Sequence, residues 1–258
     1  MIGGKLLSEG GYGCVFYPEI PCSKKEKISE KHASKIQIYD KSAKKEISIG
    51  KKIQNITGFK NHFAPVLSSC FVNVSQIKEQ DAKGCSVLQK KNNKFILLKM
   101  LYIDGPNFIS FMVNNRNSRQ IINNVIHSYN HLLTGLRLLI SKNIIHYDIK
   151  GDNILFNLTL QAPTLIDFGL SMDFNEINKD NLKKYFYVYA PDYYIWPLEI
   201  HYLCFLLHKN KKPTIIDLQL LVKTYIKNNV ALIKNFSPQF LEQFEKLCMK
   251  QLIIYKNM

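Results

Sequence analysis

The stretch His146–Leu155 reads HYDIKGDNIL and decides the interpretation of this 258-residue chain. It places the carboxylate Asp148 five residues before the carboxamide Asn153. A second block, Leu165–Leu170 (LIDFGL), puts Asp167 nineteen residues after Asp148. Phosphoryl transfer needs a carboxylate that orients the attacking hydroxyl, and Asn and Asp oxygens that hold Mg²⁺ against the phosphates. The two blocks therefore predict a site of magnesium-dependent phosphoryl transfer.

Two motifs near the start of the chain fit the same chemistry. The glycine-rich run Ser8–Val15 (SEGGYGCV) lies between apolar stretches, and its glycines let backbone amides close over a phosphate chain. Lys35 follows in a predicted strand, and Glu46 lies in a predicted helix where it could pair with that lysine. Each motif alone is weak, because a glycine hairpin can be purely structural and most Lys–Glu pairs are surface accidents.

The order, residue types and spacing of these blocks resemble those of the protein kinase family over roughly residues 5–200. The resemblance implies an α+β fold of two lobes. The N-lobe, residues 1–102, would be small and β-rich and would form the nucleotide roof. The C-lobe, residues 103–258, would be reduced and mainly helical.

The apolar pattern supports this division. We expect three antiparallel strands within residues 5–40, a helix at Ser42–Ile56, and strands at Ala64–Val74 and Phe95–Tyr102. Apolar residues at helical spacing over Ile121–Ile140 then predict a long buried helix.

The same pattern continues through the C-terminal half. Short strands are expected at Asn153–Phe156 and Thr164–Ile166, and amphipathic helices near residues 197–208, 214–235 and 238–253.

The resemblance assigns the catalytic roles by position. Lys35 would contact the α and β phosphates of ATP and be held by Glu46. Asp148 would be the catalytic base, and Lys150 would neutralise the γ phosphate. A lysine two positions after the base is the serine/threonine pattern of the family.

The resemblance also assigns the binding residues. Asn153 and Asp167 would hold Mg²⁺. Besides Lys35, the residues expected to contact ATP come from the glycine-rich loop, the roof, the hinge and the floor: Gly10, Gly11, Gly13, Val15, Ala33, Met100, Leu101, Ile103 and Leu155.

Several positions depart from the family pattern. Ser8 replaces the first loop glycine, and we expect weaker nucleotide binding from that change. Gly50 stands four residues after Glu46, where the family places a large apolar side chain. An unfilled void there would cost about 2–5 kcal/mol, so either a neighbour compensates or the helix sits differently.

Two further departures concern regulation. Tyr147 replaces the arginine that meets an activation-loop phosphate, and the segment Met172–Ile200 contains no Ser or Thr. We hypothesise that the enzyme does not need serine or threonine phosphorylation of this loop. The segment Tyr187–Tyr202 looks like that of divergent kinases of nucleocytoplasmic large DNA viruses.

Composition bounds the setting. The net charge of +15 fits either a solvated lysine-rich surface or partners that are acidic, such as acidic or nucleic-acid-associated protein substrates or nucleic acid itself. The six cysteines show no CxxC pairing, so we expect reduced thiols, with Cys14 packed in its strand. The protein would then be cytoplasmic, in a host cytoplasm, virus factory or virion if viral. The longest apolar run, around Leu203–Leu207, is too short to insert in a membrane.

Two alternatives to a protein serine/threonine kinase stay open at this point. The chain could be a pseudokinase that acts as a binding scaffold, because Ser8, Gly50 and the segment after Pro191 are unusual. It could also be a small-molecule phosphotransferase on the same fold, since such enzymes share the Asp, Asn and second Asp pattern.

Overall fold

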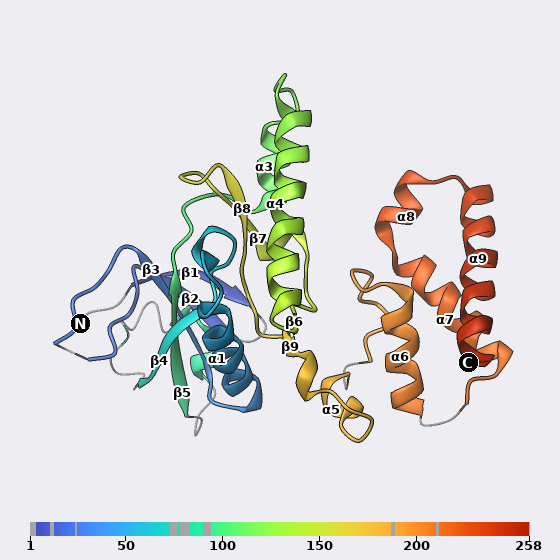
Figure 1. Ribbon diagram of the computed structural model, residues 1–258, viewed down its shortest axis with the longest axis horizontal. Helices are drawn as coiled ribbons and strands as arrows, with labels where there is room; N and C mark the ends of the chain where they lie inside the picture. Colours follow the sequence, from blue (N-terminus) through green and yellow to red (C-terminus); the bar gives the residue numbers. More distant parts are fainter. Residues whose placement is uncertain are drawn as a thin grey trace. The chain divides into compact units, whose positions relative to one another are not determined.

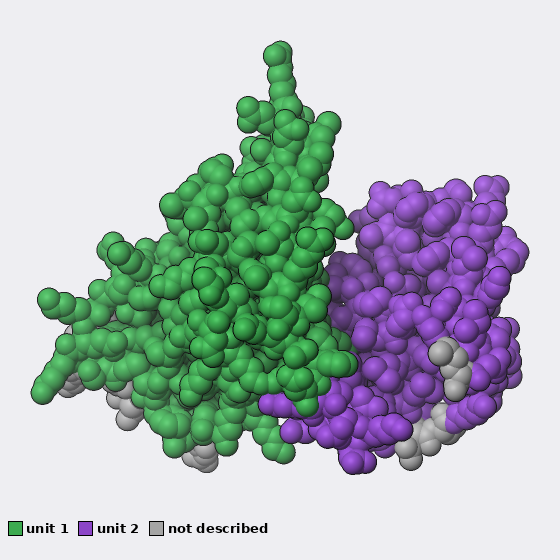
Figure 2. Space-filling view, in the orientation of Figure 1, with its two compact units in different colours: residues 1–175 green, residues 176–258 purple. Residues whose placement is uncertain are grey.

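The computed structural model describes residues 4–10, 13–23, 25–72, 77, 83–89, 94–186, 189–209 and 212–257. The chain forms two compact units, Met1–Asn175 and Glu176–Met258, which Figure 2 colours separately. The predicted lobe boundary at residues 102 and 103 lies inside the first unit and stays a prediction.

The first unit is built on a five-stranded sheet of order β1-β2-β3-β5-β4 (Figure 1). All its neighbouring strands are antiparallel. The strands are β1 (Lys5–Gly10), β2 (Gly13–Tyr17), β3 (His32–Ile38), β4 (Val66–Val72) and β5 (Phe95–Leu101). The five strands expected from the apolar pattern are therefore confirmed.

The helix α1 (Lys41–Gln54) begins at Asp40, whose carboxylate accepts the backbone N–H of Ala43 at 2.9 Å. Its apolar stripe is buried, with Ile49 and Ile53 at 2% and 0% exposure. A small core joins α1 to the sheet: Ala43, Val66, Ile96 and Leu98. The amphipathic spacing thus places α1 against one side of the sheet.

The opposite face of the sheet carries a second core. Alternate residues of β5, Phe95 and Leu97, join Cys14 and Phe16 of β2 there, because successive strand side chains point to opposite faces. The cover comes partly from the segment after β2 and partly from the short 3-10 helix η3 (Ser86–Gln89). The inner strands β2, β3 and β5 are therefore largely buried on both faces.

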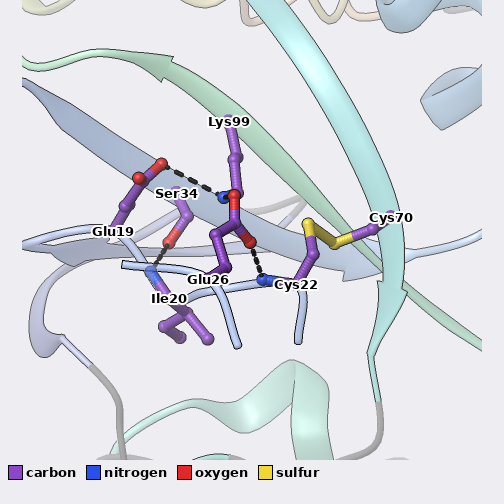
Figure 3. The surroundings of a disulfide bond; sticks show 7 residues. All are labelled: Glu19, Ile20, Cys22, Glu26, Ser34, Cys70 and Lys99. Atoms are coloured by element: carbon purple, nitrogen blue, oxygen red, sulfur yellow. Dashed lines mark hydrogen bonds and ion pairs between the residues drawn. A yellow bond between two sulfur atoms is a disulfide. The ribbon is translucent and has the colours of Figure 1, made fainter. Parts of the chain in front are cut away.

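Two disulfides tie this cover to the strands. Cys14 pairs with Cys85 across 71 residues of sequence, and Cys22 pairs with Cys70 across 48 (Figure 3 shows the second). Cys204 and Cys248 are buried and form no disulfide. The expectation of reduced thiols is thus wrong for four of the six cysteines. Spacing could not reveal the pairs, because the strand order of the sheet brings these distant positions together.

Buried charges accompany the Cys22–Cys70 disulfide (Figure 3). Lys99 of β5 is 6% exposed and forms ion pairs with Glu19, at 3.4 Å, and with Glu26. Glu26 also accepts the backbone N–H of Cys22 at 2.6 Å. These contacts neutralise the lysine inside the cover, as a buried charge requires.

The remainder of the first unit supplies the loops of the site. Its elements are α3 (Phe108–Asn114), α4 (Ile121–Ser141), β6 (Ile144–Ile145), the 3-10 helix η4 (Gly151–Asn153), β7 (Ile154–Asn157), β8 (Ala162–Leu165) and β9 (Met172–Asp173). Strand β7 pairs with β8, and β6 pairs with β9. The two predicted strands correspond to β7 and β8.

The helix α4 is long, as predicted, but it is not buried throughout. Only Ser128, Gly135 and Leu139 are fully buried, whereas Ile122 and Ile126 are 70% and 56% exposed. One stripe of α4 packs toward β6 and β8. The apolar residues of its first half lie largely off this stripe, which is why burial was predicted wrongly.

The second unit is helical. It contains α5 (Leu182–Tyr185), α6 (Leu198–Lys209), α7 (Ile215–Asn228), α8 (Val230–Asn235) and α9 (Pro238–Asn257). The three predicted helices are confirmed, with the middle one divided at Asn229, whose side chain accepts the N–H of Leu232. Asp192 accepts a hydrogen bond from Asn228 at 2.6 Å. None of the helices that the described ranges contain is long and apolar enough to cross a bilayer.

Candidate active site

A buried ion pair lies between the sheet and α1. Lys35 Nζ lies 3.2 and 3.1 Å from the two carboxylate oxygens of Glu46. The residues are 7% and 3% exposed. Burial alone would lower the pKa of Lys35, but Glu46 and Asp167 hold it above its usual value. Burial raises the pKa of Glu46 even though Lys35 opposes this. The predicted pairing of the two residues is present.

Asp167 completes this first cluster. Its Oδ1 accepts from Lys35 Nζ at 3.2 Å and from the backbone N–H of Gly169 at 3.4 Å. Burial would raise the pKa of Asp167, but Lys35 holds it below its usual range, so the carboxylate stays ionised. Its backbone has a positive φ of 57°, a strained conformation that turns the side chain toward the lysine.

Gly50 leaves no void. A Cβ at this position would lie 2.4 Å from the carbonyl oxygen of Val66, so the missing side chain lets α1 approach β4 closely. The ring of Phe63 packs edge-on against Phe168 with centroids 6.1 Å apart, and both rings are fully buried. Close packing of α1 on β4 thus fills the space at Gly50, and Phe63 packs against Phe168 from the segment before β4.

A second cluster surrounds Asp148. The Nδ2 atom of Asn153 donates to the backbone oxygen of Asp148 at 2.9 Å and to its Oδ2 at 2.7 Å. Lys150 Nζ lies 3.1 Å from the same Oδ2. Asp148 is 6% exposed and Asn153 equally so. The loop thus holds one carboxylate oriented by an amide and a lysine.

His146 links the two clusters through the backbone. Its Nδ1 accepts the backbone N–H of Asp148 at 3.3 Å, so its Nε2 carries the proton and donates to the carbonyl of Ile166 at 3.0 Å. Burial lowers the pKa of His146 and keeps the ring neutral. Ser171 Oγ donates to the carbonyl oxygen of His146 at 3.1 Å. The histidine therefore fixes the loop that bears Asp148 beside the strand that leads to Asp167.

The two predicted metal ligands lie on adjacent segments. The backbone N–H of Ile166 donates to the carbonyl of Asn153 at 3.0 Å. Asn153 is therefore hydrogen-bonded to the residue that directly precedes Asp167. Among the residues that the structure describes, no group of three or more His, Cys, Asp or Glu side chains could hold a metal ion. An amide and a carboxylate oxygen fit Mg²⁺, which usually takes one or two protein ligands plus phosphate oxygens.

Most of the predicted nucleotide-binding residues lie on β2, β3 and β5, the inner strands of the sheet, which include the strand of Lys35. Val15 pairs with Lys35 across β2 and β3, and Ala33 pairs with Met100 across β3 and β5. The remaining positions are as follows: Gly10 pairs with Gly13, Leu101 ends β5, Ile103 is buried just beyond it, and Leu155 lies in β7. Gly11 lies outside the described residues.

Sequence reasoning missed two contacts in this region. Gln37, 3% exposed on β3, donates from Nε2 to Glu46 Oε2 at 3.3 Å. Lys52 of α1 forms an ion pair with Asp173 of β9, which is 3% exposed. The alternation of β3 places Gln37 on the same face as Lys35 and could have indicated the first contact. Nothing in the sequence pattern signals the second.

Comparison with known proteins agrees with this geometry. The model of the protein kinase domain family matches residues 3–195. The chain therefore belongs to the protein kinase family.

Individual relatives match over shorter stretches. A serine/threonine-protein kinase candidate of Mycoplasma genitalium is 31% identical over 81 residues, 31% of this chain and 20% of that protein. Serine/threonine-protein kinase STE20 of Debaryomyces hansenii is 52% identical over 46 residues, 18% of this chain and 4% of that protein. Mitogen-activated protein kinase kinase kinase 8 of Rattus norvegicus is 50% identical over 46 residues, 18% and 9% of the two chains. The chain thus spans a fifth or less of each of these relatives.

Proposed function

We propose that this chain is an ATP- and Mg²⁺-dependent protein kinase that phosphorylates serine or threonine hydroxyls. One observation carries the proposal. A single compact unit holds both the Lys35–Glu46–Asp167 cluster and the Asp148–Lys150–Asn153 cluster. The first set suits phosphates and a metal ion, and the second suits an acceptor hydroxyl.

The residues divide the work. ATP supplies the phosphoryl group that is transferred. Lys35, held by Glu46, binds phosphate oxygens, and Asn153 and Asp167 would hold Mg²⁺. Asp148 Oδ2 orients the acceptor hydroxyl and takes its proton.

Lys150 has two roles in the proposed reaction: it neutralises charge and it favours a class of acceptor. It contacts Asp148 Oδ2 at 3.1 Å and is therefore close enough to neutralise charge on the transferred group. A lysine at this position also favours serine and threonine as acceptors, by the family pattern.

We further propose that activity needs no serine or threonine phosphate on the segment Met172–Ile200. Asp173 supplies a carboxylate to Lys52 of α1, the helix that bears Glu46. Strand β9, which contains Asp173, also pairs with β6 through Ile144. The carboxylate of Asp173 thus joins α1 to the strand that precedes the catalytic loop. In proteins that are switched by phosphorylation, a loop phosphate makes this kind of contact.

The charge of the chain favours acidic substrates. With 35 Lys and Arg against 20 Asp and Glu, the protein attracts acidic or phosphate-bearing segments and disfavours basic ones. Acidic and nucleic-acid-associated proteins are the partners that fit this charge.

The test is a transfer assay with labelled MgATP and three acceptors: an acidic protein, a basic protein and a small alcohol. We expect transfer to serine and threonine of the acidic protein, and a loss of at least a thousandfold in Asp148→Asn. Nucleotide binding without any transfer would establish the scaffold alternative, and transfer to the alcohol alone would establish the small-molecule alternative. Prior phosphatase treatment should leave the rate unchanged; its loss would refute activation without a loop phosphate.

A further inference from the structure

The segment that contains Cys85 and Ser86 holds both strands of the glycine-rich hairpin. Cys85 is bonded to Cys14, the residue after Gly13 on β2. The backbone N–H of Ser86 donates to Glu9 Oε1 on β1 at 2.8 Å. Hydrogen bonds from the side chain and the backbone of Ser86 lower the pKa of Glu9, so the acceptor is a carboxylate. One short segment is therefore joined to β2 by a disulfide and to β1 by a hydrogen bond with a carboxylate.

The apolar side chains of this segment are buried. Cys14 and Cys85 are both 0% exposed, and Val87 and Leu88 of η3 are 5% and 8% exposed. All four belong to the second core, on the face of the sheet opposite α1, which we call the outer core. Movement of the hairpin would have to disturb this core as long as the disulfide is closed.

The attachment lies on the face away from the nucleotide side. Val15 and Gly13 pair with Lys35 and Gln37, whereas Cys14 between them contributes to the outer core. The disulfide therefore leaves the phosphate-facing side of β2 open. It can influence ATP only through the position of the hairpin.

We propose that Cys85 and Ser86 are positioning residues for the nucleotide roof, and that reduction of the Cys14–Cys85 disulfide weakens ATP binding. The inference rests on the proposed kinase function. In the reductive step a dithiol gives two electrons and two protons to the disulfide, which yields the thiols of Cys14 and Cys85 while the dithiol becomes a cyclic disulfide. The hairpin then keeps the core contacts and the exposed Glu9–Ser86 bond, and it closes over ATP less often.

The chain offers a matched control. The Cys22–Cys70 disulfide (Figure 3) joins the same cover to β4. Strand β4 is at the opposite edge of the sheet from β1. Loss of this disulfide should disturb the cover without releasing the hairpin. The double variants Cys14→Ser/Cys85→Ser and Cys22→Ser/Cys70→Ser can therefore be compared directly.

The experiment measures the Kd of a fluorescent ATP analogue with Mg²⁺, together with KM and kcat for transfer. In Cys14→Ser/Cys85→Ser we expect Kd and KM for ATP to rise five- to tenfold, with kcat and the KM for the acceptor within twofold of wild type. The Cys22→Ser/Cys70→Ser control should stay within twofold throughout. Equal changes in both double variants, or an unchanged Kd in the first, would overturn the proposal.

A second variant covers the case in which the double variant does not fold. Glu9→Ala removes the acceptor for Ser86, and we expect a two- to threefold rise in the Kd for the ATP analogue. Glu9→Gln keeps an acceptor oxygen and should restore most of the affinity. An unchanged Kd in Glu9→Ala would count against the anchor. The binding assay needs no transfer, so failure of the kinase function would show separately as wild-type binding without phosphorylation.

Discussion

Replacing Gly50 by alanine tests the close approach of α1 to β4. Glycine in a helix interior is usually replaced by alanine with a gain of about 1 kcal/mol in helix propensity. At Gly50, however, the new Cβ would lie 2.4 Å from the carbonyl oxygen of Val66 and 3.1 Å from its Cβ. Ordinary contact begins at 3.4 Å, so α1 must move from β4 by up to about 1 Å.

A second helical glycine makes the magnitude measurable. A Cβ at Gly135 of α4 would lie 3.3 Å from the ring of Phe63, a side chain that can yield by a few tenths of an ångström. Both substitutions gain the same helix propensity, so their difference isolates the steric term. Overpacking against backbone costs roughly 1–3 kcal/mol, and we expect Gly50→Ala to be less stable than Gly135→Ala by that amount.

The assay is urea unfolding of the two variants and the wild type, with free energies of unfolding compared at equal slope. Gly50→Ala should also lower the rate of phosphate transfer, because Glu46 lies one turn away and moves with α1 away from Lys35. The reasoning is refuted if Gly50→Ala is as stable as Gly135→Ala, or if it is stabilised relative to wild type.

Three further outcomes are expected. Phe63→Ala should lower the free energy of unfolding by about 3–5 kcal/mol, because it removes a fully buried ring that packs on Phe168. As the pH falls, transfer activity should be lost at a pH above 4.5, the ordinary pKa of a glutamate, because burial raises the pKa of Glu46. Protonation of Glu46 removes the charge that holds its lysine partner. Glu46→Gln should be less active and should lack this loss of activity at acid pH. Reduction of Cys22–Cys70, measured in the Cys14→Ser/Cys85→Ser background, should lower the free energy of unfolding by about 2–5 kcal/mol.

Each of these outcomes has its control. Phe71 of β4 is 49% exposed, and Phe71→Ala should lower the free energy of unfolding much less than Phe63→Ala does, by about 1 kcal/mol or less. A loss of activity at acid pH that persists in Glu46→Gln would have to be assigned to another group. A reductant effect of equal size in a variant that lacks all four bonded cysteines would show that the disulfides are not its cause.

The residues of the candidate site could be grouped from the sequence because their signals are local. Asp148, Lys150 and Asn153 lie within six positions, and their contacts in the structure are contacts within one loop. The strands followed from their apolar stretches for the same reason. The pairing of Lys35 with Glu46 could be predicted because the resemblance to the kinase family assigns a role to both residues. Their spacing alone does not require the pairing.

The features that were missed depend on where distant segments meet. The Cys14–Cys85 pair needs the strand order of the sheet and the segment between β4 and β5, neither of which has a period in the sequence. Gly50 looked like a defect because its role appears only against Val66. The first half of α4 has more apolar residues than one stripe can bury, so periodicity overestimated its burial.

The contact between Lys52 and Asp173 has a consequence for how long the enzyme works. A phosphate can be added by one enzyme and removed by another, whereas an aspartate stays in place from synthesis to degradation. On the proposed function, a phosphatase has nothing to reverse at this contact, and the amount of active enzyme follows the rates at which the chain is made and destroyed. Timing would then be set by gene expression and turnover instead of by signalling.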